Sequence, residues 1–319
     1  MTISIDLDKP VAVVGAGLVG AGWAIAFARA GLTVRVFDAD PQIAARSLPW
    51  AAEQLRALHA RGLLDERPER VAARLQPAPS LQDAVAGAMY VQESVLERID
   101  VKRALMEQID ALADASVVIG SSSSGIPASD FANDLAISAR VLIAHPVNPP
   151  YLVPVVELVP STQTSAATVA FVERLMTAIG QSVVHVRKEV EGFVLNRLQA
   201  ALLREAWALH REGVASCEDI DKTVRDGLGW RWSFMGPFET IDLNAPGGVA
   251  DYARRLGPLY HGIVRSRVDE GPWDDALIAR VEQDRRQYLP ADELAARRDW
   301  RDAKLMDFAA ARRASDARD

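Results

Sequence analysis

Short apolar runs alternate with amphipathic stretches over the first 188 residues of the chain. The runs are rich in valine and isoleucine, and their lengths are typical of buried strands. Strands are predicted at residues 11–14, 33–37, 89–93, 116–120, 141–145, 153–159 and 182–188. Helices are predicted at residues 18–30, 41–75 (a hairpin with a turn at 62–67), 81–86, 100–112, 128–135 and 165–180. This alternation predicts a largely parallel sheet with helices on both faces.

Helical patterns dominate the chain from about Gly192 onward. They cover residues 193–212, 217–227, 236–243, 248–267, 273–287 and 291–313. A chain of 319 residues is long enough for one large or two ordinary domains. We therefore expect an α/β domain at residues 1–188 and an all-helical domain at residues 189–319.

A glycine-rich turn stands where the first predicted strand enters the first predicted helix. Gly15 permits a tight turn, Gly17 allows a pyrophosphate to approach the backbone, and Gly20 lets the helix pack against the strand. The first N–H groups of the helix can then donate to the phosphates. The turn predicts a Rossmann-type dinucleotide-binding domain. Its expected cofactor-binding residues are Gly15, Gly17, Leu18, Val19 and Gly20.

An acid at the end of the second predicted strand selects between the two nicotinamide dinucleotides. Asp38 lies eighteen residues after Gly20. Its carboxylate can accept hydrogen bonds from the ribose hydroxyls of NAD and would repel the 2′-phosphate of NADP. Ala39 and Asp40 offer no cation for that phosphate, and Arg35 is expected on the opposite face of the strand. The predicted cofactor is NAD.

Charge and composition argue against several other classes of function. The net charge of −7 disfavours nucleic acid or an anionic membrane as the principal partner. The single cysteine, Cys217, excludes an internal disulfide and fits a reducing compartment. The N-terminus lacks the basic region of a signal peptide, and no apolar run approaches the length of a membrane span. We expect a cytoplasmic protein without a metal site.

Two ionisable residues in later strands suggest acid–base chemistry. His145 ends an apolar strand at the sheet edge that holds the glycine turn, where a neutral imidazole could accept a hydroxyl proton. Glu157 interrupts the apolar face of the next strand and needs a donor once it is buried. In our hypothesis Glu157 holds Nδ1 of His145 and leaves Nε2 free as a base. The alternatives are a histidine that fills a loop, and an arginine or a helix terminus as the partner of Glu157.

Two further polar features have both structural and chemical interpretations. The four serines at 121–124 could satisfy backbone groups of a turn, or one hydroxyl could hold a substrate oxygen. No G-x-S-x-G motif surrounds them, so a serine nucleophile is not expected. Asn196 lies on an apolar helical stripe, where its amide must find partners. A structural and a substrate-binding role both remain open for Asn196.

Six segments of the chain, taken together, resemble the 3-hydroxyacyl-CoA dehydrogenase superfamily. More narrowly, they resemble its lambda-crystallin branch, the L-gulonate 3-dehydrogenases. The segments are GAGLVGAGWA, QESVLERIDVK, GSSSSG, AHPVNPPYLVPVVELVP, KEVEGFVLNRLQ and GLGWRWSFMGPFETIDLNA. The similarity extends from about residue 10 to residue 306, nearly the whole chain.

The resemblance implies roles for individual residues. His145 matches the family's catalytic histidine and Glu157 its partner acid, while Ser124 and Asn196 match residues that hydrogen-bond the substrate oxygen. The positions that contact NAD in the family are Asp38, Glu97, Lys102 and Asn148. The resemblance also implies a homodimer formed through the helical domain. The hairpin at residues 41–75 is where acyl-CoA members contact CoA, and nothing in it is diagnostic of such a site here.

The segment before MGPFE bears on the substrate. Acyl-CoA members have glycine where this chain has Arg231, between Trp230 and Trp232. A guanidinium suits a small free carboxylate, with Asn244 on the sugar hydroxyls, although Arg231 could instead stack between the tryptophans. We expect NAD-dependent oxidation of the 3-hydroxyl of a small acid, first L-gulonate. The alternatives are L-carnitine, a short hydroxy acid, a 3-hydroxyacyl-CoA, or a non-catalytic NAD-binding structural protein.

Overall fold

A computed structural model of the chain describes residues 6, 8–267 and 271–316. The chain forms two compact units. The first unit comprises Met1–Arg197 together with Arg298–Asp319, and the second comprises Leu198–Arg297. No helix in the described ranges is long and apolar enough to cross a membrane.

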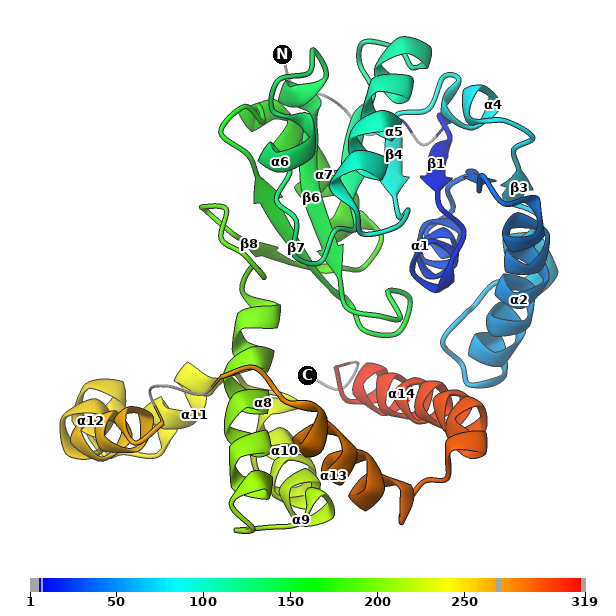
Figure 1. Cartoon of the computed structure of the whole chain (residues 1–319). Coiled ribbons are helices and arrows are strands. Elements are labelled where there is room, and N and C mark those ends of the chain that lie inside the picture. Colours follow the sequence, from blue (N-terminus) through cyan, green and yellow to red (C-terminus); the bar gives the residue numbers. More distant parts are fainter. Residues whose placement is uncertain (1–5, 7, 268–270, 317–319) are drawn as a thin grey trace. The chain divides into compact units, whose positions relative to one another are not determined.

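An eight-stranded sheet forms the centre of the first unit, in the order β3-β2-β1-β4-β5-β6-β7-β8 (Figure 1). The strands are β1 (Val11–Val14), β2 (Val34–Phe37), β3 (Leu75–Pro77), β4 (Tyr90–Glu93), β5 (Val118–Ser121), β6 (Val141–Pro146), β7 (Val155–Pro160) and β8 (Ser182–His185). Every neighbouring pair is parallel except β6 and β7. The strand order reverses between β1 and β4, and such switch points are where sheets of this kind bind ligands.

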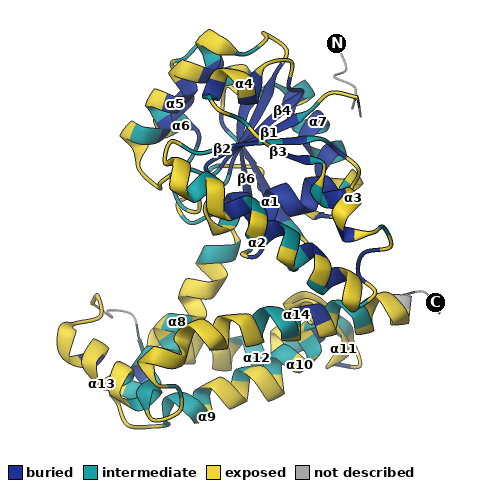
Figure 2. Ribbon diagram, turned by 90° about the vertical axis from the view of Figure 1, so that its right-hand side faces the viewer, coloured by how far each residue is buried: buried dark blue, intermediate teal, exposed yellow. Residues whose placement is uncertain are grey.

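Helices cover both faces of this sheet. They are α1 (Leu18–Arg29), α2 (Pro41–Ala60), α3 (Pro68–Ala72), α4 (Leu81–Val85), α5 (Ile99–Leu112), α6 (Ser129–Ala132) and α7 (Ala166–Ala178), with a 3-10 turn at Ser138–Arg140. One core includes Trp23 and Phe27 of α1 with Phe171 of α7, and the other includes Met106 of α5 with Phe131 of α6. Figure 2 shows the central strands and the inward helix faces of this unit as buried, whereas the edge strands β3 and β8 are largely exposed or half-buried. The predicted fold class, a Rossmann-type sheet followed by helices, is confirmed.

The remaining elements are all helical. They are α8 (Leu195–Arg211), α9 (Cys217–Lys222), a π-helical segment (Thr223–Leu228), α10 (Gly229–Trp232), α11 (Pro237–Leu243), α12 (Gly248–Arg265), α13 (Asp275–Arg286), a 3-10 turn (Ala291–Glu293) and α14 (Leu294–Asp316). Most of α14 belongs to the first unit, where Met306 joins the core beside α1 and α2. The domain boundary expected between residues 188 and 189 remains a prediction. The two compact units divide at Arg197 instead, and the first unit also contains most of the C-terminal helix.

Candidate functional site

The glycine turn stands at the switch point of the sheet. Gly15 has a φ of +95°, and a Cβ on it would lie 2.4 Å from the carbonyl oxygen of Ser94. A Cβ at Gly20 would lie 1.8 Å from the carbonyl oxygen of Gly15, so packing alone requires glycine at both positions. A Cβ at Gly17, the N-cap of α1, would meet no described atom within 4 Å. The open space at Gly17 fits a ligand that approaches the backbone there.

Asp38 lies beside this turn and is fixed by two backbone groups. Its Oδ2 accepts from the N–H of Ala16 at 2.7 Å, and its Oδ1 accepts from the N–H of Asp40 at 2.9 Å. Arg35 donates to the carbonyl oxygens of Asp83 and Ala86, so it is engaged elsewhere. An oriented carboxylate with free lone pairs beside an open helix N-terminus fits the ribose and the pyrophosphate of NAD.

His145 and Glu157 are directly paired residues of the antiparallel strands β6 and β7. Nδ1 of His145 lies 2.7 Å from Oε2 of Glu157, and the two side chains are only 6% and 4% exposed. Because an ionised carboxylate can only accept, Nδ1 carries the hydrogen, and in the neutral imidazole Nε2 then keeps its lone pair. The predicted contact is present, and the catalytic roles of both residues stay predictions.

A helix terminus also holds Glu157. Its Oε1 accepts from the N–H groups of Val194 and Leu195, both at 2.9 Å, where α8 begins. The preceding residue, Phe193, has a φ of +51° and is fully buried, with its ring 5.7 Å from that of His145. The histidine and the helix terminus were alternative partners in the sequence-based prediction. The structure uses both, one on each carboxylate oxygen.

These donors keep Glu157 ionised. Burial raises the pKa of Glu157, but the hydrogen bond from His145 and those from Leu195 and Val194 together hold that pKa below its ordinary value. A carboxylate that stays ionised beside Nδ1 stabilises an imidazolium that forms when Nε2 takes up a proton.

The serine run at 121–124 is anchored by Glu97. Oε1 of Glu97 accepts from the hydroxyl of Ser123 and from the N–H of Ser124, both at 2.7 Å. The amide of Asn196 donates to the carbonyl oxygen of Ser124 at 2.7 Å. Within the described ranges no side-chain partner engages the hydroxyl of Ser124, and the residue is exposed. The structure thus brings Ser124 and Asn196 together, and Asn196 follows Leu195, which holds Glu157.

Lys102 lies inside the protein. Its side chain is 1% exposed, and Nζ lies 3.0 Å from both carboxylate oxygens of Glu93 and 3.2 Å from Glu97. Burial raises the pKa of Glu97, but Ser123, Lys102 and backbone N–H groups outweigh it, so that pKa is lowered. The geometry favours an indirect role for Lys102 through Glu97, and its contact with NAD stays a prediction.

Glu93 has a larger part in this cluster than the sequence indicates. It is fully buried and also accepts from the hydroxyl of Ser121 and from the N–H of Val95. The available signal was an acid at the end of an apolar strand, nine residues before a lysine. Its burial against Lys102 depends on the docking of α5 beside β4, which no local pattern specifies.

Three predicted residues are not tied to this site by the described contacts. Asn148 is exposed in the segment after β6. Arg231 lies half-buried in α10, and among the described residues no carboxylate pairs with it. Asn244 is exposed at the end of α11. Arg231 and Asn244 belong to the second unit, and their roles in substrate binding stay predictions.

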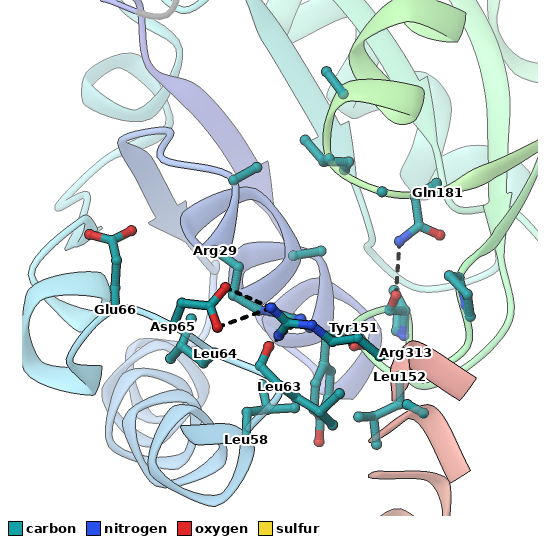
Figure 3. Close-up of a pocket in the computed structure, with 18 residues that line it drawn as sticks. Arg29, Leu58, Leu63, Leu64, Asp65, Glu66, Tyr151, Leu152, Gln181 and Arg313 are labelled. Carbon is teal, nitrogen blue, oxygen red and sulfur yellow. Dashed lines mark hydrogen bonds and ion pairs between the residues drawn. The ribbon is translucent and has the colours of Figure 1, made fainter. Parts of the chain in front are cut away.

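A cavity of about 560 Å³ lies elsewhere in the first unit, lined by parts of α1, the segment before β7 and α14 (Figure 3). Arg29 donates to the carbonyl oxygens of Tyr151 and Leu63, both at 3.0 Å. Arg313 pairs with Asp65 at 2.8 Å. No predicted site residue is among its lining residues. The cavity is therefore separate from the proposed chemistry.

Cys217 takes part in a small polar cluster of the second unit. Its N–H donates to Asp284 at 2.8 Å, and its Sγ lies 3.7 Å from Nδ1 of His210. Burial, reinforced by the neighbouring carboxylate, raises the pKa of the Cys217 thiol to about 11. A protonated thiol there links α8, α9 and α13, which is a structural role.

Comparison with known proteins assigns the family. Residues 10–190 match the profile of the 3-hydroxyacyl-CoA dehydrogenase NAD-binding domain, and residues 192–275 match that of the 3-hydroxyacyl-CoA dehydrogenase C-terminal domain. The chain belongs to the 3-hydroxyacyl-CoA dehydrogenase family. It is an NAD-dependent dehydrogenase that acts on a hydroxyl group.

Individual relatives place the chain in the lambda-crystallin branch of this family. Lambda-crystallin of Oryctolagus cuniculus is 40% identical over 95% of this chain and 96% of its own length. An L-carnitine dehydrogenase of Streptomyces coelicolor is 40% identical over 88% of this chain and 84% of its own. A solved structure of 5-formyl-3-hydroxy-2-methylpyridine 4-carboxylic acid 5-dehydrogenase, an NAD+-dependent dismutase, is 30% identical with a TM-score of 0.75, covering 83% of this chain and 84% of that one.

Proposed function

We propose that this dehydrogenase oxidises the 3-hydroxyl of a small hydroxy acid, with L-gulonate as the first candidate. The arrangement of His145 carries the proposal, since its Nδ1 is held at 2.7 Å by Glu157 and its Nε2 is left with a lone pair. Two observations support the substrate class: the resemblance of the six sequence segments to the L-gulonate 3-dehydrogenases, and the 40% identity to lambda-crystallin. Arg231, which has no carboxylate partner among the described residues, is available for an acid group.

In the proposed mechanism each side chain has one task. Bound NAD supplies the acceptor for the hydride that leaves the hydroxyl-bearing carbon. Nε2 of His145 accepts the hydroxyl proton, and Glu157 stabilises the imidazolium. The hydroxyl of Ser124 and the amide of Asn196 hold the reacting oxygen. The N–H groups of the glycine turn would hold the pyrophosphate, and the carboxylate of Asp38 would hold the adenosine ribose.

A carboxylate site on Arg231 gives a kinetic prediction for Arg231→Ala. We expect KM for the acid substrate to rise by roughly tenfold or more, because a charge-assisted hydrogen-bonded pair is lost. Arg225→Ala is the matched control, since Arg225 lies in the π-helical segment directly before α10 and already pairs with Asp226 at 2.8 Å. An unchanged KM in Arg231→Ala would remove Arg231 from the substrate site.

L-carnitine is the second candidate, because an L-carnitine dehydrogenase is among the relatives at 40% identity. NADH formation should be measured with L-gulonate, L-carnitine, 3-hydroxybutyrate and 3-hydroxybutyryl-CoA. We expect the highest kcat/KM with L-gulonate. A higher value with L-carnitine or with the CoA ester would replace L-gulonate as the substrate. NADH binding without turnover of any of the four would favour a structural NAD-binding protein.

We also propose a homodimer formed through the second unit. In the single chain, α12 has no buried residue, and large apolar side chains on it are exposed, including Leu259, Ile263 and Val264. An apolar helix face of this kind is typical of an oligomer interface. Sedimentation equilibrium should give twice the chain mass of 34.7 kDa. A mass of one chain at micromolar concentration would contradict the dimer.

A further inference from the structure

A chain of hydrogen bonds leads from the core of the first unit to Ser94. The hydroxyl of Tyr90 lies 2.7 Å from Oε1 of Gln92, and Nε2 of Gln92 donates to Oγ of Ser122 at 2.8 Å. Nε1 of Trp23 also donates to Oγ of Ser122, at 3.2 Å. Oγ of Ser94 lies 2.8 Å from Oγ of Ser122. Tyr90, Gln92 and Trp23 are fully buried, so solvent cannot replace the bonds that they donate, whereas Ser94 and Ser122 are half-buried.

Ala144 fixes which way the amide of Gln92 points. The carbonyl oxygen of Ala144 lies 3.5 Å from Nε2 of Gln92. With the amide reversed, two oxygens would face each other in buried surroundings, which is unfavourable. Gln92 therefore donates to Ser122 and accepts from the hydroxyl of Tyr90.

The direction of the last bond follows from the lone pairs of Ser122. A hydroxyl oxygen has two lone pairs. Trp23 and Gln92 occupy both on Ser122, so Ser122 cannot accept from Ser94 and must donate to it. The hydroxyl hydrogen of Ser94 is then free, and no acceptor for it lies among the described residues. Ser94 thus ends this series of hydrogen bonds, with a hydroxyl hydrogen that no acceptor in the described ranges engages.

Ser94 lies at the switch point of the sheet. It directly follows β4, and its N–H donates to the carbonyl oxygen of Val14 at 2.7 Å. A Cβ at Gly20 would lie 3.3 Å from Cβ of Ser94, and a Cβ at Gly15 would overlap its carbonyl oxygen. The residue is therefore packed against the two glycines whose turn fits the dinucleotide.

We propose that Ser94 donates a hydrogen bond to bound NAD and that Trp23, Gln92 and Ser122 are positioning residues that direct its hydrogen outward. The pyrophosphate and ribose groups of the dinucleotide offer acceptor oxygens. A hydroxyl whose direction is fixed in advance loses little freedom on binding. The proposal concerns the cofactor and holds whichever hydroxy acid is the substrate.

Ser94→Ala tests the donor directly. The dissociation constants of NADH and NAD+ should be measured by isothermal titration calorimetry without substrate. We expect binding to weaken roughly 2- to 12-fold if a ribose oxygen accepts the bond, the range for one neutral hydrogen bond, and roughly 12- to 150-fold if an oxygen of the charged pyrophosphate accepts it. The variant removes one half-buried oxygen, and its Tm without ligand shows that it folds. Parent-like dissociation constants for both nucleotides would overturn the proposal.

Gln92→Glu tests the positioning role with nearly unchanged shape. A carboxylate only accepts, so Ser122 would turn its hydrogen to residue 92 and Ser94 would donate inward. NADH binding should weaken in Gln92→Glu, and adding Ser94→Ala should weaken it little further. Trp23→Phe repeats the test without adding a buried charge. It frees one lone pair of Ser122, so that Ser122 can accept from Ser94. If the losses of NADH affinity were fully additive when Ser94→Ala is combined with Gln92→Glu and with Trp23→Phe, the positioning role would be overturned.

Tyr90→Phe is the matched control. It removes a buried hydroxyl from the same chain of bonds but leaves both donors to Ser122 and the contact with Ala144 in place. Its NADH affinity should equal that of the parent even if its Tm falls. A loss of NADH affinity as large as that of Ser94→Ala would show that these hydrogen bonds affect binding only through the stability of the fold. That result would overturn the proposal.

Discussion

Two carboxylates, Glu93 and Glu157, are buried at the same edge of the sheet, yet their partners differ. Glu93 is fully buried against the ammonium of Lys102, with both oxygens 3.0 Å from Nζ. Glu157 is 3% exposed and faces the imidazole of His145. A lysine ammonium is ordinarily a permanent cation at neutral pH, whereas an imidazole gains and loses a proton there. Only the second pair can respond to a proton that arrives from a substrate.

The remaining contacts of each acid strengthen this difference. Glu93 binds Ser121 and the backbone of Val95, which fixes the start of the serine run. Glu157 takes two N–H groups from the start of α8, so its charge persists when its partner changes charge. A buried acid at a ligand-binding edge is therefore no sign of catalysis by itself. Whether such an acid takes part in catalysis depends on whether its partner can gain and lose a proton.

The largest effect is expected for His145→Ala. Removing the proposed base should lower kcat by roughly 10²- to 10⁴-fold, with little change in NADH affinity. The control is His185→Ala, whose side chain is half-exposed and pairs with Glu173 at 3.3 Å. Steady-state kinetics and NADH titration measure both quantities. A kcat within a few-fold of the parent would show that the His145–Glu157 pair, like the Glu93–Lys102 pair, takes no part in catalysis.

Lys102→Met should act on stability. It leaves Glu93 buried without its cation, and breaking a buried pair in this way typically costs about 3–5 kcal/mol of unfolding free energy. Lys304→Met is the matched control, because Lys304 is 61% exposed and lies 3.5 Å from Asp307. Its effect should stay below about 1 kcal/mol. Equal urea denaturation midpoints for the two variants would contradict a structural role for the Glu93 pair.

Glu157→Gln should lower kcat by roughly 10- to 100-fold while the protein stays folded. A glutamine amide can donate to Nδ1 of His145, which would move the imidazole hydrogen to Nε2 and remove the base. It also cannot stabilise the imidazolium by charge. The measurement is kcat between pH 6 and pH 9. If kcat and its dependence on pH equalled those of the parent, Glu157 would have no part in the mechanism.

The smallest effect concerns stability in acid. The pKa of Glu157 is lower in the folded chain than its unfolded value near 4.5, so the folded state binds fewer protons between these values. The stability that Glu157 contributes is therefore complete above about pH 4.5 and is lost as pH falls through the folded pKa. The difference in unfolding free energy between the parent and Glu157→Gln should shrink over that range. A difference that grows on acidification would contradict the lowered pKa.

The sequence predicts much of this fold because the valine-rich runs and their helical spacers are local signals. It misses β3, since Leu75–Pro77 is only three residues long and ends in proline at the sheet edge. It also gives no direction for β7, because an apolar run looks the same in a parallel and an antiparallel strand. That direction places Glu157 opposite His145.

The candidate site was predictable where one residue carries the signal. His145 ends an apolar strand and Glu157 interrupts one, and the structure places the two side chains in contact. The pairing of Glu93 with Lys102 and the outward hydroxyl of Ser94 were not predictable. They depend on which donors surround an oxygen in three dimensions, and sequence spacing does not contain that information.

The tautomer of His145 determines whether Nε2 can act as the base. Nitrogen-15 NMR of the imidazoles at pH 8 distinguishes a protonated Nδ1 from a protonated Nε2, and the signal of His145 is identified by its loss in His145→Ala. We predict a hydrogen on Nδ1 and a lone pair on Nε2, with the opposite tautomer in Glu157→Gln. A hydrogen on Nε2 in the parent protein would show that His145 has no lone pair there for the hydroxyl proton and is not the base.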